Sequence, residues 1–259
     1  MYNTGLDVSS GGVEQISQMN NLGAIPAYFE LSTGFSGCTV LDADGNLIPG
    51  PRLDALNAIL SNNNPNLRVG YYHFLYNQTY THCPFNCYQQ GQIFGRALVN
   101  NAIASTNYLF ALDIENATYG LSPNTDSTIP LSTIEQDVTD FMNGLESVIT
   151  GNFSVMIYSN LNFINNISSP AMYESSQLTA AKLWLASALP ANEVYPGFQP
   201  NNSQIQAAQT LMNEIYWGGV QGWSGWQCAI SGESGLTIDI DLFNMDAITL
   251  EGMYYNPIN

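Results

Sequence analysis

Short apolar runs, separated by segments with a helical period, occupy most of the chain up to residue 188. The runs are rich in β-branched and aromatic side chains and lie at residues 24–31, 67–76, 108–114, 153–158 and 182–188. Nearly continuous apolar character is typical of parallel strands that are covered on both faces. The pattern therefore predicts five parallel strands.

The segments between these runs predict helices at residues 52–60, 87–101 and 132–149. In the second segment, Ile93, Ala97 and Leu98 form an apolar stripe. The third segment opens with Ser132 three residues before Glu135, which is a capping-box signature. Alternation of strands and helices is typical of an α/β fold with a parallel sheet, closed or open.

The last part of the chain has a different pattern. Residues 219–230 and 236–243 read as strands joined by a short Gly/Ser/Glu turn, which predicts a meander rather than further βα units. No linker, repeat or low-complexity tract marks a domain boundary, so we expect residues 1–259 to form a single domain.

Composition excludes several classes of partner. The chain has 21 acidic and 4 basic residues, and its net charge of -17 follows from the scarcity of lysine and arginine. Without a basic stripe we expect neither nucleic-acid binding nor recruitment to an anionic membrane. No apolar run reaches the roughly 18 residues of a membrane span, so we expect no membrane insertion. The start, MYNTGLDVSS, lacks the features of a signal peptide, so we expect a cytosolic chain or one that has lost a leader.

The four cysteines are even in number, which suits two disulfides with three possible connectivities. They are Cys38, Cys83, Cys87 and Cys228, and the middle two are close enough in sequence for a local bridge. A zinc site would use His82 with that pair, but no second pair of ligands follows it. We therefore expect disulfides and no metal.

The sharpest chemical feature is a pair of acids at the end of an apolar run, Asp113 and Glu115. Strand side chains alternate, so both face the same way with Cα atoms roughly 6.5 Å apart. Parallel barrels place their chemistry at this carboxyl end of a strand. Two like charges in a partly desolvated site should raise one pKa, and a raised acid beside an ionised one suits glycoside hydrolysis. The alternative is that the two acids simply end a strand and begin a solvated loop.

Other acids occur in similar surroundings. Asp7 follows Gly5 and Leu6 near the start of the chain, and Asp239 and Asp241 lie two residues apart in a late apolar run. A lone acid at a strand end is usually structural. Recurrence at the first, middle and last strands of a barrel favours convergence on one acidic pocket.

Taken together, these motifs resemble the family 25 glycoside hydrolases, which are N-acetylmuramidase lysozymes. The resemblance rests on GLDVSS (5–10), GYYHF (70–74), DIE (113–115), IYSN (157–160), LWLA (183–186), WQ (226–227) and ID (238–239), in the family's order. It implies a flattened TIM-like barrel of five βα units followed by about three strands, with residues 1–259 forming a single catalytic domain.

The resemblance also implies roles for the acids. Glu115 matches the general acid, and Asp113 matches the acid beside it. Asp7 matches the N-terminal acid, and Asp239 matches the late acid that completes the cluster. Asp239 is preferred to Asp241 because the aromatic residue of the family motif then falls in place.

The positions that line the sugar groove in the family are matched by Tyr72, Tyr158, Trp184 and Gln227. From the residues alone, the alternative is that these side chains pack in the core, and for Trp184 that alternative is favoured. His73 lies in the same matched segment, but strand alternation turns it away from Tyr72, which predicts a hydrogen-bonded structural histidine.

The sequence departs from the family pattern at two places. Gly11, Gly12 and Val13 stand where most members have Trp-Gln, and Thr33 stands where members carry a glutamate. Residues 35–51 and 77–90 form longer segments that we expect after the second and third strands, at the catalytic face.

The implied activity is cleavage, with retention, of the β-1,4 bond between N-acetylmuramic acid and N-acetylglucosamine in bacterial peptidoglycan. Assistance by the substrate's acetamido group is favoured over attack by Asp113, and no cofactor is expected. The substrate places the protein in an extracellular or lysosome-like compartment. Two alternatives remain: a catalytically weak glycan-binding or toxin-associated protein on the same barrel, and an enzyme that acts on chitin-like polymers.

Overall fold

The computed structural model describes residues 2–8, 26–33, 68–100, 107–122, 126–150, 152–186, 216–221, 225–229 and 239–244, with a few residues between 202 and 213. For several strands, among them the first two and the last, it describes the backbone alone. The predicted helix at residues 52–60 and the long segment 35–51 lie outside the described residues.

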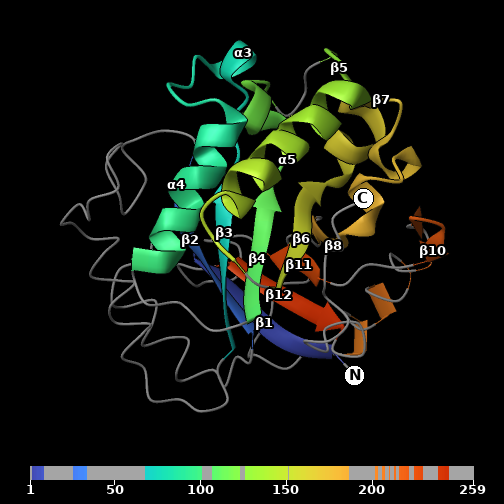
Figure 1. Ribbon diagram of the computed structural model, residues 1–259. Helices are drawn as coiled ribbons and strands as arrows, with labels where there is room; N and C mark the ends of the chain where they lie inside the picture. Colours follow the sequence, from blue (N-terminus) through green and yellow to red (C-terminus); the bar gives the residue numbers. More distant parts are fainter. Residues whose placement is uncertain are drawn as a thin grey trace.

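Eight strands form a closed barrel (Figure 1). In order around the barrel they are β1 (Tyr2–Val8), β2 (Pro26–Thr33), β3 (Arg68–Phe74), β4 (Asn107–Asp113), β6 (Asn152–Asn160), β8 (Lys182–Ala186), β11 (Gly225–Ala229) and β12 (Asp239–Asn244). Neighbouring strands are parallel from β1 to β11, and β12 runs antiparallel to both β11 and β1. The predicted α/β barrel is confirmed, and the antiparallel pairing of β11 with β12 agrees with the predicted meander.

The five predicted strands correspond to β2, β3, β4, β6 and β8, and β4 shows why their sequences are continuously apolar. Phe110, Ala111 and Leu112 are consecutive and fully buried. Ala111 packs inside the barrel, in a cluster with Met156 and Trp184. Its neighbour Phe110 points the other way and meets the Phe94 ring of a covering helix, with ring centroids 5.5 Å apart. Both faces of the strand are therefore covered, as the pattern predicts.

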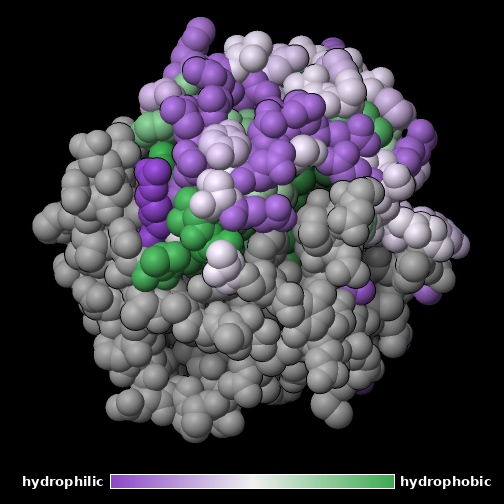
Figure 2. Space-filling view, in the orientation of Figure 1, coloured by the Kyte–Doolittle hydropathy of each residue, from purple (hydrophilic) through white to green (hydrophobic). Residues whose placement is uncertain are grey.

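Two helices, α4 (Cys87–Asn100) and α5 (Leu131–Glu146), lie side by side on the outside of the barrel (Figure 1). The stripe predicted for α4 is buried. The helix backbones approach closely at two glycines, because a Cβ on Gly91 would overlap the Phe141 carbonyl and one on Gly144 would overlap the Tyr88 carbonyl. Figure 2 shows mostly hydrophilic side chains over α5 and a hydrophobic area over the lower part of α4.

The start of α5 differs from the prediction. The helix begins at Leu131 after Pro130, so Ser132 lies within the first turn and no capping box forms. Pro130 belongs to β5 (Ile129–Pro130), which pairs with β7 (Ser168–Ser169), and this pairing together with the fixed proline φ sets the start. Glu135 instead accepts a 2.6 Å hydrogen bond from the Ser175 hydroxyl.

Short elements follow the carboxyl ends of β3, β4 and β6. They are α3 (Gln78–Thr81) after β3, the 3-10 helix η2 (Asn116–Tyr119) after β4, and the π-helical turn η3 (Phe163–Ile167) after β6. Two further 3-10 turns, η4 (Met172–Glu174) and η5 (Leu178–Ala180), precede β8, and β9 (Tyr216–Trp217) pairs with β10 (Val220–Gln221). The first three of these elements surround the edge at which the predicted acids lie.

The local bridge that the spacing of Cys83 and Cys87 allows does not form, and the expected disulfides are absent at these two positions. Both side chains are buried thiols, and the Cys87 thiol donates a 3.4 Å hydrogen bond to Asp137 of α5. Because α4 begins at Cys87, that side chain points toward α5, where the Asp137 carboxylate accepts its hydrogen bond. The side chains of Cys38 and Cys228 lie outside those described. Among the described helices, none is long and apolar enough to cross a membrane.

Candidate active site

Asp113 is the last residue of β4, and its side chain is buried. In the parallel register it stands between Phe74 of β3 and Tyr158 of β6, and Tyr158 in turn stands beside Trp184 of β8. Partners in a parallel register point to the same face of the sheet, and Asp113 follows the interior residue Ala111 by two positions. Asp113, Tyr158 and Trp184 therefore belong to one layer that faces the inside of the barrel.

Glu115 lies just beyond the end of β4. The amide of Ile114 donates a 2.9 Å hydrogen bond to the Tyr158 carbonyl, so pairing with β6 continues past the strand end. Glu115 itself is extended, with φ of -147° and ψ of -173°. Strand alternation thus continues through this residue and brings Glu115 to the same side as Asp113.

The backbone of Glu115 is closed onto the turn that follows it. The Thr118 hydroxyl donates a 2.6 Å hydrogen bond to the Glu115 carbonyl and accepts a 3.2 Å bond from the Glu115 amide. Thr118 is fully buried. The turn ends at Gly120, whose left-handed φ of 66° favours glycine. One threonine therefore fixes both backbone groups of Glu115.

The Glu115 carboxyl accepts a hydrogen bond from the side-chain amide of Asn160 at the end of β6. The Asn160 oxygen accepts a 2.9 Å bond from the Phe163 amide, which directs its nitrogen toward Glu115 Oε2 at 3.4 Å and Asn116 Oδ1 at 3.2 Å. Burial raises the pKa of Glu115, and the hydrogen bond from Asn160 partly opposes this. A carboxyl with a raised pKa keeps its proton to higher pH, which is the property that a general acid needs.

The interior layers hold the four residues predicted to line a groove. Trp184 and Tyr72 are buried and pack together with Ala111 and Met156. Tyr158 is partly exposed, meets the Trp184 ring edge to face at 5.1 Å, and donates a 2.7 Å hydrogen bond to Gln227 Oε1. Tyr158 and Gln227 thus form a polar pair across the interior from β6 to β11.

The backbone places the remaining predicted acids on the closing strands. Asp7 of β1 stands directly opposite Asp239 of β12 in the antiparallel register. Asp241, two residues along, stands opposite Gln227 of β11. The side chains of the three acids lie outside those described. Thr33 has Phe74 as its partner, so its position falls in the same row around the barrel as Asp113.

His73 is structural, as the alternation predicts. It is fully buried on the outer face of β3, 4.9 Å from the Phe141 ring and 5.9 Å from the Phe94 ring. Its Nε2 lies 3.0 Å from Gln90 Oε1. Burial lowers its pKa to about 4, against a smaller opposing effect of Gln90.

Asn160 and Thr118 are contacts of Glu115 that the sequence reasoning did not single out. Asn160 ends β6 at the barrel edge where Asp113 ends β4, and that shared position was a usable signal. Thr118 stands three residues after Glu115, which is the spacing of a side chain that closes a turn.

Comparisons with known proteins find similarity in structure but not in sequence. No protein-family model and no curated protein sequence matches the chain. A family 25 glycosyl hydrolase from Bacillus anthracis is similar in structure, with a TM-score of 0.54 and 13% identity over 95% of this chain and 91% of that one. The spore cortex lytic enzyme SleM of Clostridium perfringens gives 0.56 and 16% identity over 98% and 69%. The catalytic domain of endolysin ply40, from bacteriophage P40 of Listeria monocytogenes, gives 0.53 and 13% identity over 97% and 98%.

These likenesses extend over nearly the whole chain and show a common fold. They agree with the barrel that the hydrogen-bonded strands form. They also agree with the fold that the sequence motifs imply.

Proposed function

We propose that the protein is a family 25-type glycoside hydrolase that cleaves the β-1,4 bond between N-acetylmuramic acid and N-acetylglucosamine in peptidoglycan. The observation that carries the proposal is Glu115, a carboxyl with a raised pKa, held two residues beyond Asp113 at the carboxyl edge of the barrel. The family 25 hydrolase, the spore cortex lytic enzyme and the endolysin domain share this fold, which supports the same reading.

In the proposed mechanism, Glu115 gives its proton to the glycosidic oxygen as the bond to the anomeric carbon breaks. The substrate's acetamido oxygen attacks that carbon from the opposite face and forms an oxazolinium ion. Water then attacks the same carbon and loses its proton to the Glu115 carboxylate, so configuration is retained. Asp113 and Asp239 stabilise the positive charge. The competing assignment makes Asp113 the nucleophile.

We assign sugar binding to the interior side chains that face this edge. Tyr158 is partly exposed and carries a hydroxyl that is already oriented by Gln227, so this pair presents polar groups to a sugar. The buried Trp184 packs beside the Tyr158 ring in the same layer, and Tyr72 belongs to the buried cluster against which that ring packs. Asp7 would complete the acidic end of the groove from β1.

The proposal has consequences for conditions and location. General acid–base catalysis of this kind needs no metal or cofactor. Peptidoglycan lies outside the cytoplasm, so we propose an extracellular or lysosome-like location and a single catalytic domain over residues 1–259. Because a net charge of -17 repels an anionic wall, activity at neutral pH should rise with moderate salt.

The test is to incubate the protein with purified peptidoglycan and with chitin oligomers side by side and to analyse the products by mass spectrometry. The proposal expects fragments of peptidoglycan that end in reducing N-acetylmuramic acid. Binding of peptidoglycan without release of fragments would point to a glycan-binding protein. Products from chitin alone would support a glycoside hydrolase but would contradict peptidoglycan as its substrate.

A further inference from the structure

Asp137 is a buried carboxylate on α5 that the mechanism above does not use. Its Oδ2 accepts hydrogen bonds from the side-chain amide of Asn77 at 2.7 Å and from the Tyr119 hydroxyl at 2.8 Å. Its Oδ1 accepts the bond from the Cys87 thiol at 3.4 Å. The three donors belong to three different segments: the start of α3, the end of η2 and the start of α4.

Two of these donors lead directly to the turn that holds Glu115. Tyr119 is the residue after Thr118, and the backbone amide of Asn77 donates a 2.9 Å hydrogen bond to the Thr118 carbonyl. The Thr118 hydroxyl and amide both bond to the Glu115 backbone. A continuous chain of hydrogen bonds therefore runs from Asp137 to the backbone of Glu115.

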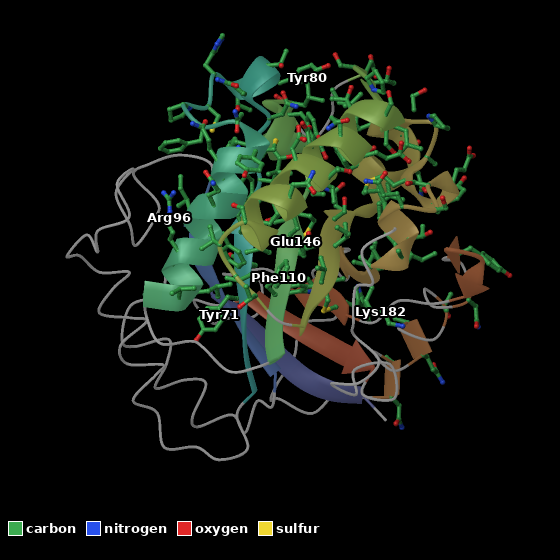
Figure 3. The ribbon with its side chains drawn as sticks, in the orientation of Figure 1. Tyr71, Tyr80, Arg96, Phe110, Glu146 and Lys182 are labelled. Atoms are coloured by element: carbon green, nitrogen blue, oxygen red, sulfur yellow. The ribbon has the colours of Figure 1, made fainter. Side chains whose placement is uncertain are left out.

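The chain of contacts also fixes the neighbouring loop. Asn77 caps α3 by accepting bonds from the backbone amides of Thr79 and Tyr80. The Tyr80 ring packs edge to face on Tyr119 at 5.6 Å. Figure 3 shows Tyr80 above the carboxyl ends of the strands, whereas Tyr71 and Lys182 lie toward their amino ends. Asp137 thus joins α5 to both loops at the proposed catalytic face.

A buried carboxylate is a costly choice if packing alone is required. Burial raises the pKa of Asp137, the bonds from Asn77, Tyr119 and Cys87 lower it, and the nearby Asp140 raises it. An apolar residue of similar size would avoid the desolvation cost at this position. What a carboxylate adds is the ability to accept several directed hydrogen bonds at once.

We propose that Asp137 is a positioning residue for Glu115, which it holds in place through Asn77, Tyr119 and the Thr118 turn. The inference rests on the proposed function of Glu115 as general acid. It assigns to α5, which contributes no residue to the proposed groove, the role of orienting the catalytic carboxyl from outside the barrel.

Two variants and one matched control test this assignment. Asp137→Asn places an amide nitrogen where one acceptor stood and so breaks part of the network. Tyr119→Phe removes one hydroxyl and keeps the ring, and it leaves the charge of the protein unchanged at neutral pH. Asp140→Asn is the control, because it makes the same substitution one turn along α5 at a partly exposed residue.

We expect Asp137→Asn to lower kcat by about 10²-fold, the scale of a misplaced catalytic group, while KM changes little. Tyr119→Phe should lower kcat by roughly tenfold, as the loss of one hydrogen bond to a charged group would. In both variants the pKa of Glu115, followed by carboxyl carbon NMR, should fall toward its ordinary value as the turn loosens. Asp140→Asn should leave kcat and the Glu115 pKa unchanged.

The inference is overturned if the folded variants keep the wild-type kcat and Glu115 pKa, or if lost activity follows only the unfolded fraction measured by circular dichroism. If Asp137→Asn does not fold, Tyr119→Phe alone decides. A wild-type protein that releases nothing from peptidoglycan would refute the proposed function. The Glu115 titration would still show whether Asp137 positions that carboxyl.

Discussion

Two titratable side chains, His73 and Glu115, are withdrawn from water in this barrel, and burial favours the neutral form of each. His73 lies between β3 and the covering helices, where its pKa falls to about 4 and its ring contacts Phe94, Phe141 and Gln90. Glu115 lies past the end of β4, where its pKa rises and part of the side chain reaches solvent. A neutral carboxyl holds a proton that a substrate can take, whereas this neutral imidazole completes the packing. Position at the barrel edge, rather than burial, separates the proposed catalytic group from the structural one.

The largest expected difference between the two is in catalysis. Glu115→Gln should reduce kcat/KM on peptidoglycan by about 10²- to 10⁴-fold, because the amide cannot supply a proton. His73→Leu should keep the wild-type kcat per folded molecule. Reducing-end release measures both, with circular dichroism to confirm the fold. A comparable loss of kcat/KM in the two variants would contradict the assignment of a catalytic role to Glu115 and a structural role to His73.

The second difference is in how stability depends on pH. The pKa of a histidine is about 6.5 in the unfolded chain, and burial lowers the pKa of folded His73 to about 4. The stability that neutral His73 contributes is therefore complete above pH 6.5 and is lost as pH falls toward 4. Between pH 7 and 4, the wild type should therefore lose about 3 kcal/mol more unfolding free energy than His73→Leu. Urea unfolding across this range gives the comparison. Parallel pH curves for the two proteins would contradict the assignment.

The stability of the protein should also be more sensitive to added side-chain volume where α4 packs on α5 than at the barrel edge beside Glu115. Gly144→Ala adds a Cβ that overlaps the Tyr88 carbonyl, so α4 and α5 must separate. We expect a loss of about 1–3 kcal/mol in unfolding free energy, with kcat retained. The control is Asn143→Ala, which changes the exposed residue next to Gly144. A thermal melt of Gly144→Ala that matches this control would show that the two helices tolerate separation.

The smallest expected effect concerns Asn160. Its hydrogen bond lowers the pKa of Glu115, so Asn160→Ala should move the alkaline limb of kcat/KM upward in pH. Asn166→Ala changes an exposed asparagine of the same segment and should leave the limb in place. A downward shift in Asn160→Ala would mean that this amide does not stabilise the charged carboxylate.

The sequence predicts what depends on local pattern. The apolar run before Asp113 predicts both a strand covered on two faces and an acid at its end, and alternation from Tyr72 predicts that His73 faces outward. The capping box at Ser132 failed because the helix begins at Leu131, directly after Pro130, which pairs with Ser169. That pairing spans 39 residues, and no local pattern records it.

The specific pairings of Glu115 and its turn could not be predicted from local pattern for the same reason. Asn160 is separated from Glu115 by 45 residues, and Asn77 is separated from Asp137 by 60. The spacing of Cys83 and Cys87 allowed a local disulfide, but in the structure the Cys87 thiol donates a hydrogen bond to the Asp137 carboxylate of α5. Asp137 did carry a signal, because it is an acid beside Ile134, Val138 and Phe141 on the buried face of α5.

The central claim is that Glu115 acts as a general acid whose pKa is raised by burial. The most direct test is the pH profile of kcat/KM for release of reducing ends from purified peptidoglycan, at constant ionic strength. We expect activity to rise from pH 7 toward about 5, along a limb displaced above the ordinary glutamate pKa near 4.3, and this limb to be absent from Glu115→Gln. An optimum at pH 8, or the same limb in Glu115→Gln, would contradict the claim.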